Sequence, residues 1–319
     1  MRKQSNPKVR EEAAGKSRME VRIGGVSFKN PVLTASGTFA YGVEFAHLMD
    51  LNSIGGIVVK GISMKPIEGN PPPRIFETSS GMLNAIGWQN IGATEFVTRK
   101  LPALTKFHTN LIVNVVGFSL EDYLEVTRFL NDYPGIAALE LNISCPNVKH
   151  GGFHFNKDPR DTYKVTAKTK KASPRIPLWV KLSPNVTDIK VFARACEDAG
   201  ADAISAINTL VGMAVDVQRR RPRLHYVTGG LSGPAIKPVA LRMVWEIART
   251  VKLPVIGIGG IANKEDALEF LIAGARAVQV GTANFYNPAA SQQIAEGLED
   301  YCRSHKIKDI NDLVGSLRV

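Results

Sequence analysis

The sequence predicts an α/β protein, specifically a (β/α)8 barrel of the TIM type, and three observations lead to this prediction. Eight short runs of apolar, mostly β-branched residues recur along the chain. Near-continuous apolar runs are typical of parallel strands that are covered on both faces. Segments with helical periodicity lie between several runs, and eight such units within about 250 residues favour a closed barrel over an open doubly wound sheet.

The eight predicted strands follow one another at intervals that suit strand–helix repeats. In a barrel of this type, the carboxyl ends of all strands meet at one face, where catalytic residues lie. We expect strands at residues 31–36, 56–61, 111–117, 138–144, 178–183, 203–208, 254–260 and 277–283.

Two connecting segments show clear helix signals, residues 188–199 and 264–273. Apolar residues recur in both at the spacing of one helix face. Polar residues that can cap a helix precede each segment, and a glycine that can end a helix follows it. The expected caps and glycines are Thr187 or Asp188 with Gly200, and Asn263 with Gly274.

Three connections are too long and irregular to be plain helices. They cover residues 62–107, 145–161 and 209–233, and each follows the carboxyl end of a predicted strand. Long loops at that face of a barrel are usually functional.

The chain carries a net charge of +11, from 40 Lys and Arg against 29 Asp and Glu. Residues 1–18 contribute +4, and we expect them to form a disordered basic tail ahead of one barrel domain at 19–319. A second basic cluster, residues 219–223, falls in an expected loop. Because aromatic residues do not alternate with the basic ones, a solvated basic surface is favoured over a nucleic-acid interface.

The three cysteines, Cys145, Cys196 and Cys302, are too few for a disulfide framework and suit a reducing cytoplasm. No run of about 18 apolar residues predicts a membrane span, and no apolar run behind the N-terminus predicts a secretory signal.

Polar residues or glycines mark the end of nearly every predicted strand. Any one of them has a structural explanation, such as capping a loop. Together they predict a ring of donors and cations around one pocket. The ring consists of Ala35, Ser36, Gly37, Lys60, Asn114, Asn142, Cys145, Lys181, Asn208, Thr209, Gly259, Gly260, Gly281 and Thr282.

Two glycine-containing strand ends predict a phosphate site. Gly259-Gly260 and Gly281-Thr282 end the seventh and eighth strands, where barrels frequently bind phosphate, and Gly233 can add a further backbone amide. Tight turns are the structural alternative. The pattern is not a dinucleotide fingerprint, because no GxGxxG opens a helix after an early strand.

Cys145 lies in the segment LNISCPN, just past a buried strand, and Pro146 disfavours helix at its position. A thiolate there can act as nucleophile, metal ligand or general base. No CxxC or His–Cys spacing supports a metal, so none is expected. His150 and His154 are nearby but are interpreted as surface loop residues.

Lys60 and Lys181 lie within apolar strands. A lysine in that position needs an anionic partner or a shifted pKa. A flavin offers such a partner, since positive charge near its N1 side stabilises the reduced form. A Schiff-base lysine is the alternative.

Nine segments of the chain resemble the class 1 dihydroorotate dehydrogenases, flavin enzymes of pyrimidine synthesis. The N-terminal membrane helix of class 2 enzymes is lacking, and cysteine stands at residue 145 where they have serine. Two segments, SGMLNAIG and TGGLSGPAIKP, resemble the NAD-linked class 1B branch, in which a second subunit carries FAD and a [2Fe–2S] cluster. The nine segments are NPVLTASGTFAYG, GGIVVKGIS, GMLNAIGWQN, LELNISCPNVKHGG, VKLSPNVTDI, INTLVGMAVD, TGGLSGPAIKP, GIGGI and VQVGTANF.

The resemblance implies oxidation of (S)-dihydroorotate to orotate in UMP synthesis, with one FMN per chain and a homodimeric core. Cys145 would remove the C5 proton while hydride passes from C6 to N5 of FMN. Electrons would then reach NAD through the FAD/[2Fe–2S] subunit. The implied substrate residues are Lys60, Asn84, Ala85, Ile86, Gly87, Trp88, Asn142, Asn147, Asn208 and Thr209. The implied FMN residues are Ala35, Ser36, Gly37, Lys60, Gly61, Asn114, Asn142, Lys181, Ile207, Gly233, Gly259, Gly260, Gly281 and Thr282.

Two positions depart from the family pattern: Trp88 replaces a leucine and Ala40 a glycine. Neither departure removes a catalytic group. The alternatives are a fumarate-linked class 1A enzyme, a flavin barrel acting on uracil rings, free or in RNA as in the dihydrouridine synthases, and a non-catalytic barrel.

Overall fold

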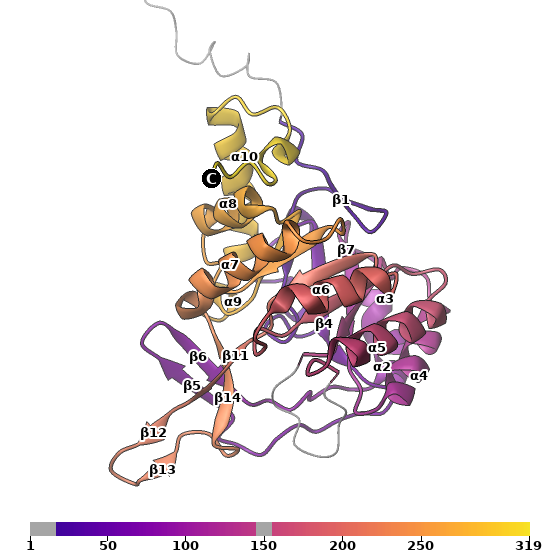
Figure 1. The fold of residues 1–319 in the computed structure, drawn as a ribbon, viewed down its shortest axis with the longest axis vertical. Helices are drawn as coiled ribbons and strands as arrows, with labels where there is room; N and C mark the ends of the chain where they lie inside the picture. The colour runs from indigo at the N-terminus through magenta and orange to yellow at the C-terminus, as the bar shows by residue number, and fades with distance from the viewer. Residues whose placement is uncertain (1–16, 145–154) are drawn as a thin grey trace, which may run out of the picture.

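The computed structural model describes residues 17–144 and 155–319, and its centre is a closed barrel of eight parallel strands (Figure 1). All eight correspond to the predicted strands, so the (β/α)8 prediction is confirmed. The barrel closes between the first and last strands, where Val32 pairs with Val278. Its strands are β3 (Val32–Thr34), β4 (Gly56–Ile62), β7 (Asn110–Val115), β8 (Ala138–Asn142), β9 (Leu178–Leu182), β10 (Ala203–Ala206), β15 (Val255–Ile258) and β16 (Ala277–Val280).

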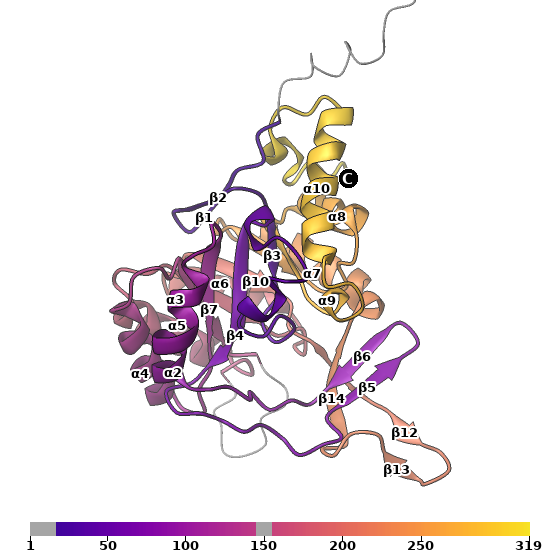
Figure 2. The same cartoon turned by 180° about the vertical axis from the view of Figure 1, so that it is seen from behind.

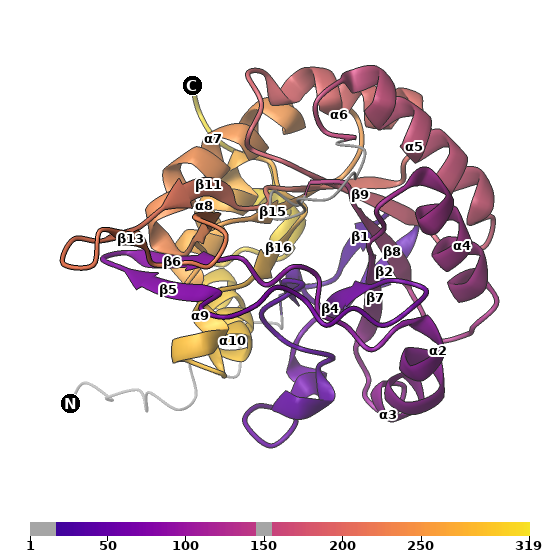
Figure 3. The same ribbon diagram turned by 90° about the horizontal axis from the view of Figure 1, so that it is seen from below.

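The helices form a ring around the strands (Figure 3). The described α-helices are α2 (Ala93–Glu95), α3 (Leu101–Leu104), α4 (Leu120–Asn131), α5 (Pro159–Ala172), α6 (Ile189–Asp198), α7 (Lys237–Ala248), α8 (Lys264–Ala273), α9 (Ala283–Tyr286) and α10 (Ala290–Ser304). The described short turns are η1 (Val43–Phe45), η2 (Leu51–Ser53), the π-helical η3 (Phe96–Lys100), η4 (Pro234–Ile236) and η5 (Ile310–Leu313). Within the described ranges no helix is long and apolar enough to cross a bilayer.

The predicted helix ends at α6 and α8 are confirmed. The Asp188 side chain accepts a hydrogen bond from the amide of Lys190 and caps α6. Asn263 caps α8 in a reciprocal pair with Asp266. Gly200 and Gly274 follow the two helices with φ of 82° and 120°, a backbone region that favours glycine.

A hairpin near the N-terminus covers one end of the barrel. Its strands are β1 (Val21–Ile23) and β2 (Val26–Phe28), and the Phe28 ring lies 5.8 Å from that of buried Trp179 in β9. The described fold begins before the expected boundary at residue 19. Ser17 Oγ donates a hydrogen bond to the carbonyl of Ile307, and the backbone amide of Arg18 donates one to the carbonyl of Lys308.

Two of the long connections build a sheet that the sequence did not predict. Residues from 62–107 and 209–233 pair in the antiparallel order β11-β14-β6-β5, beside the barrel (Figure 2). These connections are not plain helices, as expected, but long loops were expected and the strands were not predicted, because half-exposed strands give only a weak apolar pattern. The strands are β5 (Ile75–Thr78), β6 (Gly81–Asn84), β11 (Leu210–Met213) and β14 (Thr228–Ser232), with a further hairpin of β12 (Val215–Asp216) and β13 (Arg221–Pro222).

Candidate functional site

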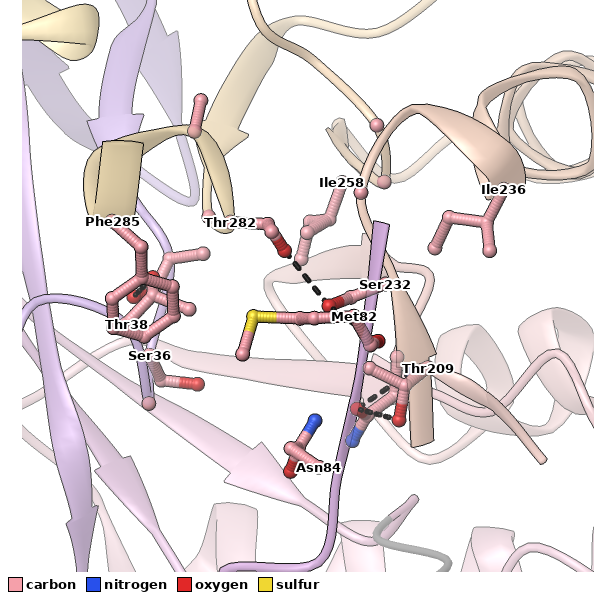
Figure 4. Close-up of a pocket in the computed structure, with 18 of the residues that line it drawn as sticks. Ser36, Thr38, Met82, Asn84, Thr209, Ser232, Ile236, Ile258, Thr282 and Phe285 are labelled. Atoms are coloured by element: carbon pink, nitrogen blue, oxygen red, sulfur yellow. Dashed lines mark hydrogen bonds between the residues drawn. The ribbon is translucent and has the colours of Figure 1, made fainter. Parts of the chain in front are cut away.

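One large cavity opens at the carboxyl ends of the barrel strands, between them and the added sheet (Figure 4). It encloses about 1300 Å³, counting its open mouth. Its lining brings residues of the barrel strands and of the added sheet to one concave place, as small-molecule sites require.

Lys60 enters this cavity from an irregular place in β4. The pairing of β4 with β7 shifts register between Val59 and Ile62, and such a bulge re-aims the side chains within it. Within residues 17–144 and 155–319, the Lys60 ammonium forms no hydrogen bond or ion pair. Burial is the main cause that lowers the pKa of Lys60, Arg74 lowers it further, and Glu44 opposes both. This cation is available for an anionic ligand.

Lys181, by contrast, is held by other groups of the barrel. It is buried at 4% exposure in β9, its Nζ lies 3.2 Å from Ser36 Oγ, and Glu140 Oε1 lies 3.6 Å from the same nitrogen. Ser36 and Lys181 both line the cavity. The ammonium is thus fixed at the cavity wall before any ligand binds.

Three asparagines form a chain of amides along the wall. Asn114 Oδ1 accepts from Asn142 Nδ2 at 3.2 Å, and Asn142 Oδ1 accepts from Asn208 Nδ2 at 3.4 Å. Asn208 Nδ2 also donates to Ser144 Oγ at 2.9 Å, and its Oδ1 accepts from the amide of Thr209 at 2.8 Å. A row of amides offers both donors and acceptors, which suits a ring that itself carries amide groups.

The glycines expected at a phosphate site lie together at the opposite end of the cavity. Gly233, Gly259 and Gly260 have φ of 94°, 130° and 74°. A Cβ on Gly260 would lie 2.9 Å from the backbone nitrogen of Lys237, so only glycine fits there. Thr282 Oγ1 donates to Ser232 Oγ at 2.8 Å and comes just before α9 (Figure 4).

Lys237 is near these glycines but is already paired. Its Nζ lies 2.7 Å from Asp266 and 3.0 Å from Glu269. The hydrogen bond to Asp266 is the main cause that raises the pKa of Lys237, while burial opposes it. An anion at the glycines would therefore be held by backbone amides and hydroxyls.

Every predicted site residue within the described ranges lines the cavity, apart from Ala85. Ala85 is 1% exposed and packs with Leu83 and Leu224 away from the cavity. Cys145 and Asn147 lie outside the described residues. The residues that line the cavity are Ala35, Ser36, Gly37, Lys60, Gly61, Asn84, Ile86, Gly87, Trp88, Asn114, Asn142, Lys181, Ile207, Asn208, Thr209, Gly233, Gly259, Gly260, Gly281 and Thr282.

The structure adds residues that the sequence analysis did not single out. Met82 of β6 points across the cavity, and Ser232 of β14 joins Thr282 (Figure 4). Phe285 and Tyr286 of α9 line its edge and are 53% and 63% exposed. No local sequence pattern marks these four residues as site residues, because they belong to segments that come together only through the added sheet and the short helix.

Trp88, one of the two departures from the expected pattern, lines the cavity with φ of 58°. Its ring lies 5.3 Å from that of Phe118. No three His, Cys, Asp or Glu side chains cluster as a metal site would require, as far as residues 17–144 and 155–319 are concerned.

Comparison with known proteins identifies the family to which this barrel belongs. The family model for dihydroorotate dehydrogenase matches residues 18–302, a range that contains all eight barrel strands and the added sheet. The chain belongs to the dihydroorotate dehydrogenase family.

Individual members of the dihydroorotate dehydrogenase family cover almost the whole chain. A relative from Geobacter sp. (strain M21), named dihydroorotate dehydrogenase B (NAD(+)), catalytic subunit, is 57% identical over 301 residues, 94% of this chain and 98% of its own length. A relative of the same name from Trichlorobacter lovleyi is 58% identical over 302 residues, 95% and 99% of the two chains.

A third dihydroorotate dehydrogenase is as similar but carries another acceptor in its name. This relative, from Solibacter usitatus, is provisionally named dihydroorotate dehydrogenase A (fumarate) and is 56% identical over 296 residues, 93% of this chain and 97% of its own. Identity at this level supports one shared dehydrogenase barrel. It leaves the electron acceptor to be tested directly.

Proposed function

We propose that this chain oxidises (S)-dihydroorotate to orotate, with FMN as its cofactor, in the synthesis of UMP. The observation that carries the proposal is one cavity in which two lysines and a chain of three asparagines share a wall with a glycine-lined end. Family membership supports the same activity.

The cavity fits FMN on its donor groups. The amides of Gly233, Gly259, Gly260 and Gly281, with Thr282, suit the phosphate, since none of these glycines carries a side chain that would block its approach. Lys181 and Asn114, held at the opposite wall, suit the polar edge of the flavin ring. Bound FMN would accept the hydride that leaves the substrate.

The substrate end follows from the remaining polar groups. Asn84, Asn142, Asn208 and Thr209 would bind the ring amides and the carboxylate, together with Asn147. Lys60, which is half-buried and unpaired among the described residues, supplies the cation that an anionic substrate needs.

Cys145 is the proposed general base, on the sequence evidence. Its Sγ would take the proton from C5 while the electron pair and hydrogen at C6 leave as hydride, so that a C5–C6 double bond forms. The residue before it, Ser144, is buried, and its hydroxyl accepts a hydrogen bond from Asn208. The described chain is therefore held in place up to the residue that precedes Cys145.

Electrons would leave this chain through a partner subunit that carries FAD and a [2Fe–2S] cluster, with NAD as final acceptor. The names of several relatives, which include NAD(+) and a catalytic subunit, support this proposal. The Solibacter relative makes fumarate the second candidate acceptor. We also propose a homodimeric core. A cytoplasmic location is proposed because Cys196 and Cys302 are buried and form no disulfide bond.

A product assay tests the proposal. The purified chain is given dihydroorotate and a redox dye, and orotate is followed by its ultraviolet absorbance. Orotate formation is expected with the dye. Its absence, in protein that holds FMN, would contradict dihydroorotate oxidation.

The same assay distinguishes the acceptors. Fumarate in place of the dye should give no turnover, and NAD should give turnover only when the partner subunit is added. Turnover with fumarate alone would instead favour the class 1A alternative.

A further inference from the structure

Glu140, in the middle of β8, is a fully buried carboxylate at 0% exposure inside the barrel. Its hydrogen-bond and ion-pair partners come from four other strands. Its Oε1 accepts from Asn114 Nδ2 at 2.7 Å, and its Oε2 accepts from Ser205 Oγ at 2.8 Å and Gln279 Nε2 at 2.7 Å. The Lys181 ammonium lies 3.6 Å from Oε1.

The negative charge of this carboxylate is balanced by a lysine of the cavity wall. A buried carboxylate is unfavourable unless it is paired. The partner here is Lys181, which lines the cavity and also contacts Ser36. The net charge that a ligand meets at this wall therefore depends on Glu140 as well as on Lys181.

Glu140 also fixes the direction of the amide chain. An ionised carboxylate only accepts hydrogen bonds, so Asn114 must present its Nδ2 to Glu140 and its Oδ1 to Asn142. Asn142 must then present its own Oδ1 to Asn208. One buried group thus sets which atoms of three asparagines face along the wall.

We propose that Glu140 is a positioning residue for both halves of the site. It orients Asn114 at the flavin wall and Asn142 and Asn208 toward the substrate, and its negative charge beside Lys181 lowers the reduction potential of the bound flavin. This inference rests on the proposed function, because it needs FMN at the wall that Lys181 lines.

Glu140→Gln tests the charge with little change of shape. Gln279 now donates to Glu140 through Nε2, and its Oε1 has no hydrogen-bond partner among the described residues, so a turn of its amide by 180° lets Oε1 accept from the new amide. Loss of the negative charge favours the reduced flavin. We expect the equilibrium constant for flavin reduction to rise at least tenfold, which is about 30 mV for a two-electron couple.

The Michaelis constant (KM) for dihydroorotate separates the effect of Glu140 on the orientation of the asparagines from the effect of its charge. In Glu140→Gln the side-chain oxygen can still accept from Asn114, so KM should change less than about threefold. Glu140→Leu removes the acceptor, frees the amide chain, and should raise KM at least tenfold. If the leucine variant fails to fold, the flavin reduction potential of the glutamine variant still tests the proposed effect of the Glu140 charge.

Ser205→Ala is the matched control, because it removes one hydrogen bond to Glu140 and keeps the charge. Its flavin potential should equal that of the wild type. If dihydroorotate reduces the wild-type flavin but Glu140→Gln leaves the flavin reduction potential unchanged, this inference is contradicted while the proposed function is not. A wild type that binds no FMN would contradict the proposed function as well.

Discussion

Lys60 and Lys181 show how neighbours give two residues of one type different roles. Lys181 is paired with Glu140 and Ser36, whereas the side-chain ammonium of Lys60 has no ion pair or hydrogen bond in the described part of the chain. Burial lowers the pKa of Lys60 and makes its charged form costly until an anion arrives. The unpaired lysine is therefore the one that a substrate can use.

Lys60→Met should weaken substrate binding without unfolding the protein. The change keeps an apolar stem and removes a buried charge, so the melting temperature should stay the same or rise. We expect KM for dihydroorotate to rise at least tenfold, measured in the dye assay. Lys171→Met, on the exposed surface of α5, is the control and should have no effect. An unchanged KM in Lys60→Met would remove this residue from the site.

Cys145→Ser should slow catalysis at neutral pH while FMN stays bound. General-base groups contribute roughly 10²–10⁴-fold to rate, and a serine hydroxyl, unlike a thiol, stays almost fully protonated at neutral pH, so it supplies very little of the basic form. Rapid-reaction flavin reduction measures this step directly. Wild-type rates in the serine variant would contradict the base assignment.

The pH profile joins these two residues. Activity should rise with pH as the Cys145 thiol, ordinarily near pKa 8.5, loses its proton. It should fall again as pH passes the pKa of Lys60, which burial lowers from 10.5, because the neutral amine no longer attracts the anionic substrate. Cys145→Ser should lose the rising limb and Lys60→Met the falling one. A falling limb that persists in Lys60→Met would assign it to another group.

At the scale of single residues, the sequence predicted the polar residues at or near the carboxyl ends of the strands and missed Glu140, which lies in the middle of β8. Strand ends are visible locally as polar residues after apolar runs. Glu140 is one polar residue inside such a run, and nothing local shows that four strands converge on it. Ala85 was grouped with its neighbours, but an extended chain alternates its sides: Asn84 and Ile86 line the cavity and Ala85 does not.

At the scale of elements, the sheet β11-β14-β6-β5 completes the site. It brings Asn84 of β6 against Gly230 of β14, where Asn84 Nδ2 donates to the Gly230 carbonyl at 3.2 Å. The barrel strands were predictable because each is a continuous apolar run. This sheet was not, because its strands are short, half-exposed and far apart in the chain.

Gly230→Ala tests the contribution of this sheet. A Cβ there would lie 2.1 Å from Thr209 Oγ1 and 2.7 Å from Thr209 Cβ, so Thr209 must move. We expect KM for dihydroorotate to rise about tenfold while FMN affinity, measured by fluorescence titration, changes less than threefold. Gly212→Ala in β11 meets only the end of the Leu83 side chain at 3.0 Å and should be milder. Equal losses of FMN and substrate binding in Gly230→Ala would contradict a specific substrate role.

At the scale of the whole molecule, the exposed surface beyond the cavity suits partner chains. Met213, Val215 and Val217 are 54%, 48% and 78% exposed on and beside the projecting β12–β13 hairpin. The same hairpin carries the basic residues 219–223, of which Arg223 pairs with Asp216 at 2.9 Å. Arg219 and Arg220 lie in the turn between β12 and β13, in keeping with the expected loop, and Arg221 begins β13, so the charge is presented on a hairpin with apolar side chains. A surface that is both basic and apolar fits a protein partner better than nucleic acid alone.

An anaerobic titration of the purified chain with dihydroorotate, followed through the visible flavin band, tests dihydroorotate oxidation most directly. The chain should carry one FMN, and the band should bleach as dihydroorotate is added. NAD should restore the band only when the partner subunit is present. A flavin band that persists in excess dihydroorotate would contradict the central claim and favour a flavin barrel that acts on another ring.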